Sequence, residues 1–463
     1  MLDSVRAFVR LGDRALTAGL LLGLCALAAP AQPATPDTVA AATPRWTEAD
    51  IRASRVEAAD AAALPQRPSW SADPMKLFVV VEAGDDHVSL VDGERFETLH
   101  RFRSREALSG APRFSPDGRS AYFSSHDGWI SRYDLWNLRL VAEVRAGLEL
   151  RHLAISRDGQ WLMAAQPQPP TLLLFDAGLN LVKTWATASR DGRTYSRVAA
   201  VLDAAPRRSF IGALQDIAEL WEISYDPTTE DFYDGLVHDY RMGEGLPVRG
   251  FLNPKRTFIS EPLASLFFDP ASTQVAGAAR AKDGVDATAQ LVNLDVRRRI
   301  ASLPLAGAPQ PGSGTAFDWN GTRVLALPNP RRAVIDVIDL RTWRLVKSIA
   351  TAGPGSFVRS HDGSCYIWTD AMMGTDVDTA LTMIDKQTLQ PVAQLRQSGH
   401  SPVHAEFTQD GRHALARVRG PQGALIVHDA TTCRQVKRLP MRGPVASYNV
   451  GNQLERPDPG HRP

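Results

Sequence analysis

Short apolar runs that end in an aspartate recur along the whole chain. Eight copies occur, ending at Asp92, Asp134, Asp176, Asp226, Asp295, Asp339, Asp385 and Asp429. The steps between these aspartates are 42, 42, 50, 69, 44, 46 and 44 residues. A repeat of roughly 40–50 residues made of short strands is typical of a β-propeller blade. The pattern therefore predicts an all-β fold, an eight-bladed β-propeller.

A second element keeps the same period: an Asp-Gly or Asn-Gly pair placed ahead of an apolar run. The pairs are Asp117-Gly118, Asp158-Gly159, Asn320-Gly321, Asp362-Gly363 and Asp410-Gly411. They accommodate positive φ, so they predict two-residue hairpins between antiparallel strands. A closed ring also needs its two terminal strands to share a blade, or both edges stay unpaired. We therefore expect the strand 76–82 to complete the blade formed by residues 414–436.

The 69-residue step marks an insertion at about 226–263. A blade here needs 42–48 residues, so roughly 25 residues are extra. The segment is rich in Tyr, Asp, Gly and Pro and contains His238 and Arg241. Long loops of this kind are often functional. We expect it to fold over one mouth of the ring as a lid.

The N-terminus differs from the rest of the chain. Arg6, Arg10 and Arg14 precede an uncharged stretch of about 15 residues and a small-residue cleavage site, which together predict a signal peptide over residues 1–31 and a periplasmic location. A retained membrane anchor is the alternative. The stretch is short for a membrane span of roughly 20 residues, and nothing else approaches that length, so we expect no transmembrane segment after processing.

Three further segments follow from composition. Residues 32–74 are rich in Ala and Pro and indicate a linker, in which Thr47-Glu48-Ala49-Asp50 predicts the capped start of a short helix ending before Pro65. The propeller occupies 75–452, and residues 453–463 form a polar, flexible tail.

Charge and cysteine content exclude several classes. The formal net charge is +1 and falls to zero without residues 1–31, so no nucleic-acid partner is expected. Cys25 leaves with the signal, whereas Cys365 and Cys433 are either bridged or, as we favour, free buried thiols. There is no Cys-x-x-Cys-His, which excludes a covalently attached c-type haem. Zinc spacings, Gly-rich phosphate loops and Gly-x-Ser-x-Gly are also absent.

Polar residues at blade ends are the remaining candidates for chemistry. His361, His404 and Tyr448 flank predicted strands, and His238 and Arg241 lie in the insertion. For each residue alone, an ordinary loop role is the more common one. Equivalent positions in different blades converge on the ring axis, however, and this favours a shared site.

Several blocks resemble the heme d1 domain family of denitrifying bacteria: 77–82, 114–119, 127–131, 141–147, 238–245, 292–296 and 447–450. The family includes cytochrome cd1 nitrite reductase and dihydro-heme d1 dehydrogenase. The resemblance covers about residues 70–452 and is closer to the dehydrogenase branch. It implies a periplasmic eight-bladed propeller with a non-covalent heme d1, or a dihydro-heme d1-like tetrapyrrole, over its axis. The family's cytochrome c domain is missing, and the helix near 47–63 resembles a remnant of its link to the propeller.

The resemblance implies roles residue by residue. His404 and Tyr448 match an active-site histidine and a pocket tyrosine of the dehydrogenase, and His361 matches a second pocket histidine of the reductases. Arg197 and Arg241 match preserved blocks and suit the carboxylates of the ring edge. His238 lies in the same block as Arg241.

Two family histidines are replaced. Ser109 stands at the position of the proximal iron ligand, and Gln310 at that of a histidine before the glycine-rich turn. Ser109 is a poor iron ligand, and Gln310 cannot move protons near neutral pH as imidazole does. His126, 17 residues after Ser109 in the same blade, is a candidate replacement ligand. The alternative, which we favour, is a solvated hairpin residue.

The resulting prediction is an oxidoreductase that takes two electrons and two protons from a dihydro-tetrapyrrole side chain in heme d1 biosynthesis. His404 would be the base, Tyr448 a positioning group, and a periplasmic cytochrome the electron acceptor; a nitrite reductase is a second protein partner to consider. One alternative is a non-catalytic tetrapyrrole carrier or chaperone, which the missing histidine favours. Another is a ligand-free propeller that binds a protein.

Overall fold

The structure is a computed structural model that describes residues 46–233, 247–280, 285–303, 305–371, 380–396, 402–418 and 422–455. The chain divides into two units, Met1–Pro44 and Arg45–Pro463, and the described residues all lie in the second. The predicted signal peptide and the last residues of the tail lie outside the described residues. Among those described, no helix is both long and apolar enough to cross a membrane.

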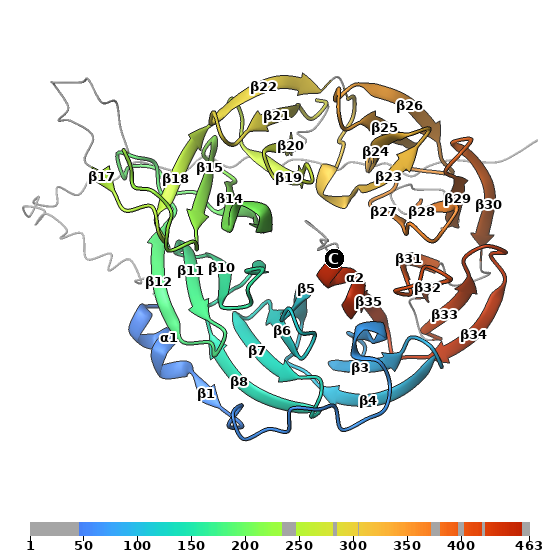
Figure 1. Cartoon of the computed structure of the whole chain (residues 1–463), viewed down its shortest axis with the longest axis horizontal. Coiled ribbons are helices and arrows are strands. Elements are labelled where there is room, and N and C mark those ends of the chain that lie inside the picture. Colours follow the sequence, from blue (N-terminus) through green and yellow to red (C-terminus); the bar gives the residue numbers. More distant parts are fainter. Residues whose placement is uncertain are drawn as a thin grey trace, which may run out of the picture. The chain divides into compact units, whose positions relative to one another are not determined.

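Eight antiparallel sheets surround one axis, which confirms the predicted eight-bladed β-propeller (Figure 1). Each blade has four strands, to which the segment before the propeller adds a fifth in blade 2, and the first strand named for each blade lies innermost. Blade 1 consists of β35 (Pro444–Asn449), β2 (Phe78–Glu82), β3 (His87–Asp92) and β4 (Glu97–Arg103), and blade 2 of β5 (Leu108–Phe114), β6 (Ser120–Ser125), β7 (Trp129–Asp134) and β8 (Arg139–Arg145). Blade 3 consists of β9 (His152–Ile155), β10 (Trp161–Pro167), β11 (Pro170–Asp176) and β12 (Leu181–Ala186), and blade 4 of β13 (Val198–Ala204), β14 (Ser209–Leu214), β15 (Glu219–Ser224) and β18 (Pro254–Phe258).

The remaining four blades are regular in chain order. Blade 5 consists of β19 (Leu263–Phe268), β20 (Gln274–Ala279), β21 (Ala289–Asn293) and β22 (Arg298–Leu303), and blade 6 of β23 (Thr315–Trp319), β24 (Thr322–Pro328), β25 (Val334–Asp339) and β26 (Leu345–Ala350). Blade 7 consists of β27 (Val358–Ser360), β28 (Tyr366–Thr369), β29 (Ala380–Asp385) and β30 (Gln390–Arg396), and blade 8 of β31 (Pro402–Phe407), β32 (His413–Val418), β33 (Ala424–Asp429) and β34 (Gln435–Pro440). Short 3-10 turns occur at η1 (Pro74–Lys76), η2 (Ala205–Arg207) and η3 (Pro311–Ser313).

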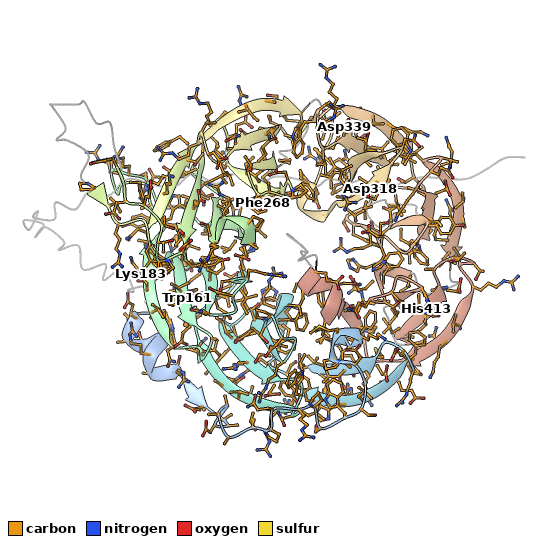
Figure 2. All side chains as sticks on the ribbon, in the orientation of Figure 1. Trp161, Lys183, Phe268, Asp318, Asp339 and His413 are labelled. Carbon is orange, nitrogen blue, oxygen red and sulfur yellow. The ribbon has the colours of Figure 1, made fainter. Side chains whose placement is uncertain are left out.

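The core is divided among the blade interfaces. Within the described residues, eight large clusters of buried apolar side chains each join one blade to the next. Figure 2 shows side chains filling the space between blades, with Trp161 in β10 and Lys183 in β12 of the same blade. Each blade is therefore stabilised mainly by its two neighbours, as expected for a radial repeat.

The repeated aspartates end the third strand of most blades, where they organise the turn to the outermost strand. Asp385 accepts hydrogen bonds from the backbone N–H groups of Gln387 (3.0 Å) and Thr388 (2.7 Å), and Leu389 follows at φ 52°. Other turns repeat this geometry at Phe96, Leu138, Trp343 and Cys433, all with positive φ. The sequence period thus reflects turn chemistry, in which a carboxylate stabilises a loop that non-glycine residues would otherwise avoid.

The Asp-Gly pairs form longer loops than predicted, with one exception. Asn320-Gly321 closes a two-residue hairpin, because Trp319 pairs with Thr322. In blade 2, Phe114 pairs with Ala121, so Asp117-Gly118 lies within a six-residue connection. There Asp117 accepts hydrogen bonds from the Ser115 hydroxyl (2.5 Å) and the Arg119 N–H (3.0 Å). These side-chain hydrogen bonds stabilise the longer connection.

The ring closes in blade 1. β35 pairs with β2, joining Phe78 to Asn449 and Val80 to Ser447. Terminal strands do share a blade, but the prediction that residues 76–82 complete the blade of 414–436 is wrong. Blade 8 already has four strands of its own, so the C-terminal strand becomes the innermost strand of the first blade instead.

The segment before the propeller wraps around the outside of blades 2 and 3 (Figure 1). Helix α1 (Glu48–Ser54) begins as predicted, with a capping box between Thr47 and Asp50, and ends well before Pro65. Ile51 is 2% exposed within the cluster between blades 2 and 3. β1 (Val56–Glu57) then pairs with β8 as a fifth strand of blade 2.

The insertion forms no ninth blade, and its described part does not cover a mouth of the ring. Its residues supply β18 and a two-stranded ribbon of β16 (Phe232–Tyr233) and β17 (Pro247–Val248). Figure 1 shows this ribbon at the outer side of blade 4, away from the axis. The lid prediction is wrong for this part, because the insertion connects the third strand to the outermost one. Residues 234–246, with His238 and Arg241, lie outside the described residues.

A half-buried acid lines the lower cavity where blade 4 meets the axis. Asp203, the penultimate residue of β13, accepts a hydrogen bond from the hydroxyl of Tyr225 at 2.8 Å, and Tyr225 is 2% exposed. Burial raises the pKa of Asp203 from 3.8 to about 7. Cys365 and Cys433 are free thiols, as favoured, but the expectation that they are buried is wrong, because Cys365 is exposed and Cys433 half-buried.

Removing the closing strand should destabilise the whole ring. A chain that ends at Met441 lacks β35, which leaves the inner edge of β2 unpaired and exposes the apolar cluster between blades 1 and 2. We expect its melting temperature to lie well below that of the full chain, with aggregation visible by size-exclusion chromatography. Equal melting temperatures would contradict closure of the ring by β35.

Asp203 should make stability depend on pH. Because its folded pKa is raised, the folded state holds the proton more tightly, and stability falls as pH rises from about 4 to about 7. Asp203→Asn keeps an acceptor for Tyr225 but carries no proton to lose. Its melting temperature relative to the wild type should therefore rise by a few degrees between pH 5 and pH 8, reflecting up to about 3 kcal/mol. A constant difference would show that the pKa of Asp203 is not raised in the folded protein.

Candidate functional site

Two connected cavities lie on the propeller axis. We call the end at which the innermost strands begin the upper mouth, and the end at which they finish the lower mouth. The cavity at the upper mouth has a volume of about 370 Å³ and that at the lower mouth about 580 Å³. Arg113, Val201 and Leu202 line both, so the two cavities meet inside the ring.

Small residues form much of the upper cavity: Gly110, Ala111, Ala199, Ala200, Ala264, Ala278, Ala279 and Ala308. Part of this surface arises from β-bulges at the start of β5, β13 and β19, where the register to the second strand shifts. Gly110 has φ +69° in the first of these, a conformation that suits glycine. Bulges re-aim the chain at such positions. The result is a floor made largely of small side chains, contributed mainly by blades 2, 4 and 5.

Arginines surround this floor. Four arginines line the upper cavity: Arg113, Arg151, Arg280 and Arg331. Arg197 lines a smaller adjoining pocket, which shares Arg151 with this cavity. Arg197 holds Asp216 with two bonds, Nε–Oδ2 at 3.2 Å and Nη2–Oδ1 at 3.0 Å. The hydrogen bond to Asp216 raises the pKa of Arg197, and Arg197 lowers that of Asp216. Arginines outnumber the carboxylates along the rim, where Glu149 pairs with Arg151 and Asp216 with Arg197, and this excess of positive charge favours anions.

Arg197 and Arg280 act on one region of the rim. With its amide oriented to satisfy both neighbours, the Gln215 oxygen accepts from Arg197 at 3.2 Å and from Arg280 at 3.0 Å. Two guanidinium groups on neighbouring blades thus converge on one point. Such a pair can hold the carboxylate of a ligand by charge-assisted hydrogen bonds.

His404 lies on the opposite side of the axis from this floor, in blade 8. It is the bulged residue of β31, with φ 56°, and it is 4% exposed. Its ring packs on Phe357 at a centroid distance of 4.3 Å. Phe357 is held in turn, because its N–H donates to buried Asp370 (3.1 Å) and its carbonyl accepts from Thr369 (2.9 Å). Burial raises the pKa of Asp370. The imidazole therefore rests on a rigid support.

Four innermost strands around blade 1 carry polar residues at one level. Each residue is the penultimate one of its strand: Arg113 of β5, Arg359 of β27, Glu406 of β31 and Tyr448 of β35. Arg359 and Glu406 form an ion pair at 3.9 Å and are 9% and 6% exposed. β31 and β35 pack against each other, so His404 and Tyr448 lie on neighbouring strands, with Tyr448 deeper along the axis.

His361 lies at the other end of the ring from His404. It follows β27, lines the lower cavity and packs near Phe407 at 6.1 Å, whereas His404 packs on Phe357, which precedes β27. The two histidines are thus at opposite ends of the same pair of strands. His361 accepts a hydrogen bond from the Gly363 N–H at 3.0 Å through Nδ1. The structure does not bring it together with His404.

The other predicted residues have different surroundings. The Ser109 hydroxyl donates to the carbonyl of Leu150 (3.3 Å), and the residue is 4% exposed, so it serves the contact between β5 and blade 3. Gln310 lines the upper cavity. His126 is exposed in the turn between β6 and β7 and does not line the cavity, which agrees with the solvated-hairpin alternative. His238 and Arg241 lie outside the described residues.

Sequence reasoning missed most of the rim and the inner polar layer. Arg113, Arg151, Arg280 and Arg331 are scattered over 219 residues and share no motif. Their common signal is position, since they line the same cavity from different blades. Within the described residues, no three His, Cys, Asp or Glu side chains gather to hold a metal ion. The floor and its arginine rim can hold a flat molecule with carboxylates at its edge, whereas His404 and Tyr448 are buried and line neither cavity.

The chain is similar in sequence to several known proteins. Residues 72–453 match the family described as "Cytochrome D1 heme domain". The chain is 46% identical over 413 residues to "Dihydro-heme d1 dehydrogenase" of Pseudomonas aeruginosa, covering 89% of this chain and 78% of the relative. It is 28% identical to "Protein NirF" of Stutzerimonas stutzeri, covering 80% and 90%.

A solved structure extends the likeness to three dimensions. The structure of "Dihydro-heme d1 dehydrogenase NirN in complex with DHE" superposes with a TM-score of 0.81 at 45% identity, covering 89% of this chain and 83% of that one. The WD40 domain of Sif2, with a TM-score of 0.53 at 12% identity, shares the fold alone. The chain belongs to the cytochrome D1 heme domain family.

Proposed function

We propose that this protein binds a dihydro-heme d1-like tetrapyrrole non-covalently at the upper mouth and oxidises one of its side chains in heme d1 biosynthesis. The observation that carries the proposal is the floor of small residues edged by arginines. A flat macrocycle can approach such a floor closely, and its peripheral carboxylates suit guanidinium groups. The relatives named for dihydro-heme d1 support the same ligand.

The residues present fit this group. Arg197 and Arg280 would hold one edge, Arg151 and Arg331 extend the cationic rim, and Gln310 offers an amide to a polar substituent. The bound iron tetrapyrrole would supply the path by which electrons leave the oxidised side chain. A separate redox protein, for which we propose a periplasmic cytochrome, would accept them. The periplasmic location rests on the signal pattern of residues 1–31.

Conversion of a propionate side chain to a conjugated acrylate removes two electrons and two protons. His404 would accept one of the protons, a role that imidazole often fills in catalysis, and the second would pass to solvent. Its rigid support on Phe357 limits the positions that its ring can take. Tyr448, on the neighbouring strand, would help to orient the side chain, and the buried pair of Arg359 and Glu406 would keep the inner end of the site polar.

A non-catalytic carrier of the same tetrapyrrole is the second candidate. One observation favours it: Ser109, at the family's ligand position, donates its hydroxyl to a backbone carbonyl. Both functions use the same floor and rim, but only the first requires His404 to exchange protons.

Replacing His404 should separate the two functions. We expect His404→Gln to lower turnover of dihydro-heme d1, measured by absorbance with an excess of electron acceptor, about 10²- to 10⁴-fold while tetrapyrrole affinity changes little. His361→Gln is the matched control, because His361 lies at the lower end of the ring and should leave turnover unchanged. Equal turnover of His404→Gln and the wild type would refute the assigned role. No turnover by any form, with binding intact, would favour the carrier.

The rim arginines should determine affinity. Arg197→Gln should weaken tetrapyrrole binding about tenfold, because one charge-assisted contact to a carboxylate is lost. Arg193→Gln changes the same charge on an adjacent turn, where the side chain is 85% exposed and away from the rim. Fluorescence-quenching titrations of both variants would measure the effect. Equal weakening by both would indicate general electrostatic attraction in place of a specific contact.

A further inference from the structure

One histidine that lines the upper cavity has no role in the proposed oxidation. His152 is the first residue of β9 in blade 3, is half-buried and lines the floor beside Arg151. Among the described residues that line this cavity, it is the only one with an imidazole. The other polar neighbours are the amide of Gln310, the hydroxyls of Ser124, Ser265 and Ser313, and arginines.

His152 occupies the register position of Ser109 on the next blade. In blade 2, Phe114 pairs with Ala121, and Ser109 pairs with Ser124, three residues further along β6. In blade 3, Ile155 pairs with Leu162, and His152 pairs with Ala165, again three residues further along β10. Both innermost strands lead into the same turn, Ser-x-Asp-Gly. The two residues are therefore structural equivalents in neighbouring blades.

Hydrogen bonds hold these two positions together. The Ser109 hydroxyl donates to the carbonyl of Leu150, two residues before His152, at 3.3 Å. Nε of Arg113 donates to the carbonyl of Leu153, the residue after His152, at 2.7 Å. β5 and β9 are thus tied on both sides of the histidine. The Ser109 and His152 positions are therefore held side by side near the upper ends of β5 and β9, and of the two it is His152 that lines the upper cavity.

From this geometry we propose that His152 supplies the axial nitrogen ligand to the iron of the bound tetrapyrrole, in place of a residue at position 109. Neutral imidazole is a common ligand of haem iron, whereas serine hydroxyl and glutamine amide are not. The proposed axial ligand thus comes from blade 3 instead of blade 2, at the same position along the innermost strand. This inference rests on the proposed tetrapyrrole site and replaces His126, which is exposed and does not line the cavity.

The test uses the full chain titrated with ferric heme d1. We expect the wild type to give the visible and electron paramagnetic resonance spectra of a nitrogen-ligated iron. His152→Ala should lose this signature and bind at least about tenfold more weakly. His126→Ala is the matched control and should leave spectrum and affinity unchanged. Free imidazole added to His152→Ala should restore the signature, because truncation leaves space at the floor.

A second variant keeps the test independent of folding defects in the first. The double variant Ser109→His/His152→Ala moves the imidazole back by one blade and should recover the nitrogen-ligated spectrum. An unchanged spectrum in His152→Ala, with circular dichroism like that of the wild type, would overturn the ligand assignment and leave the proposed function standing. Absence of any spectral change with the wild type would overturn the proposed function itself.

Discussion

The pairing of β35 with β2 is the constraint on which the rest of this structure depends. It joins residues 372 positions apart, as in the hydrogen bond from Asn449 Nδ2 to the carbonyl of Leu77. The polar residues of the inner layer lie in blades 7, 8, 1 and 2, on either side of this junction. His404 precedes the junction in the chain, whereas Arg113 comes from the blade that follows β2. The two can share one site only when the ring is closed, so folding and assembly of the site are a single event.

Much of the fold could be predicted because it is repeated eight times. Each aspartate stabilises its own turn through local backbone N–H groups, as Asp385 does, and such local chemistry leaves a period in the sequence. The choice of closing blade could not be predicted in the same way. The closing blade takes one strand from one end of the chain and three from the other. Either choice of end leaves the same spacing of aspartates in the sequence. The insertion was misjudged because a length excess does not tell between which two strands it falls.

The site was harder to predict than the fold. His404 and Tyr448 were identified through a family resemblance, and the structure places them on neighbouring strands. No local sequence motif marks Arg113, Glu406 or Arg359. They share only a register position, since each is the penultimate residue of its innermost strand. A register shift of one residue, such as the bulge at His404, changes which side chain faces the axis. Such shifts cannot be read from alternation alone.

The bulges also explain how one scaffold can exchange its ligands between blades. In β5 the chain carries extra residues between Ser109 and Arg113, whereas β9 reaches the same level without a bulge. A bulge relaxes the requirement that side chains alternate, so a residue can enter or leave the floor without disturbing the outer strands, whose pairing is kept. The apolar interfaces between blades then hold every innermost strand at a fixed distance from its neighbours. Under that constraint a histidine at position 152 and one at position 109 are two solutions to the same geometric problem. Under the proposed assignment, a propeller that has lost one ligand keeps the function of the site by using the equivalent position in the next blade.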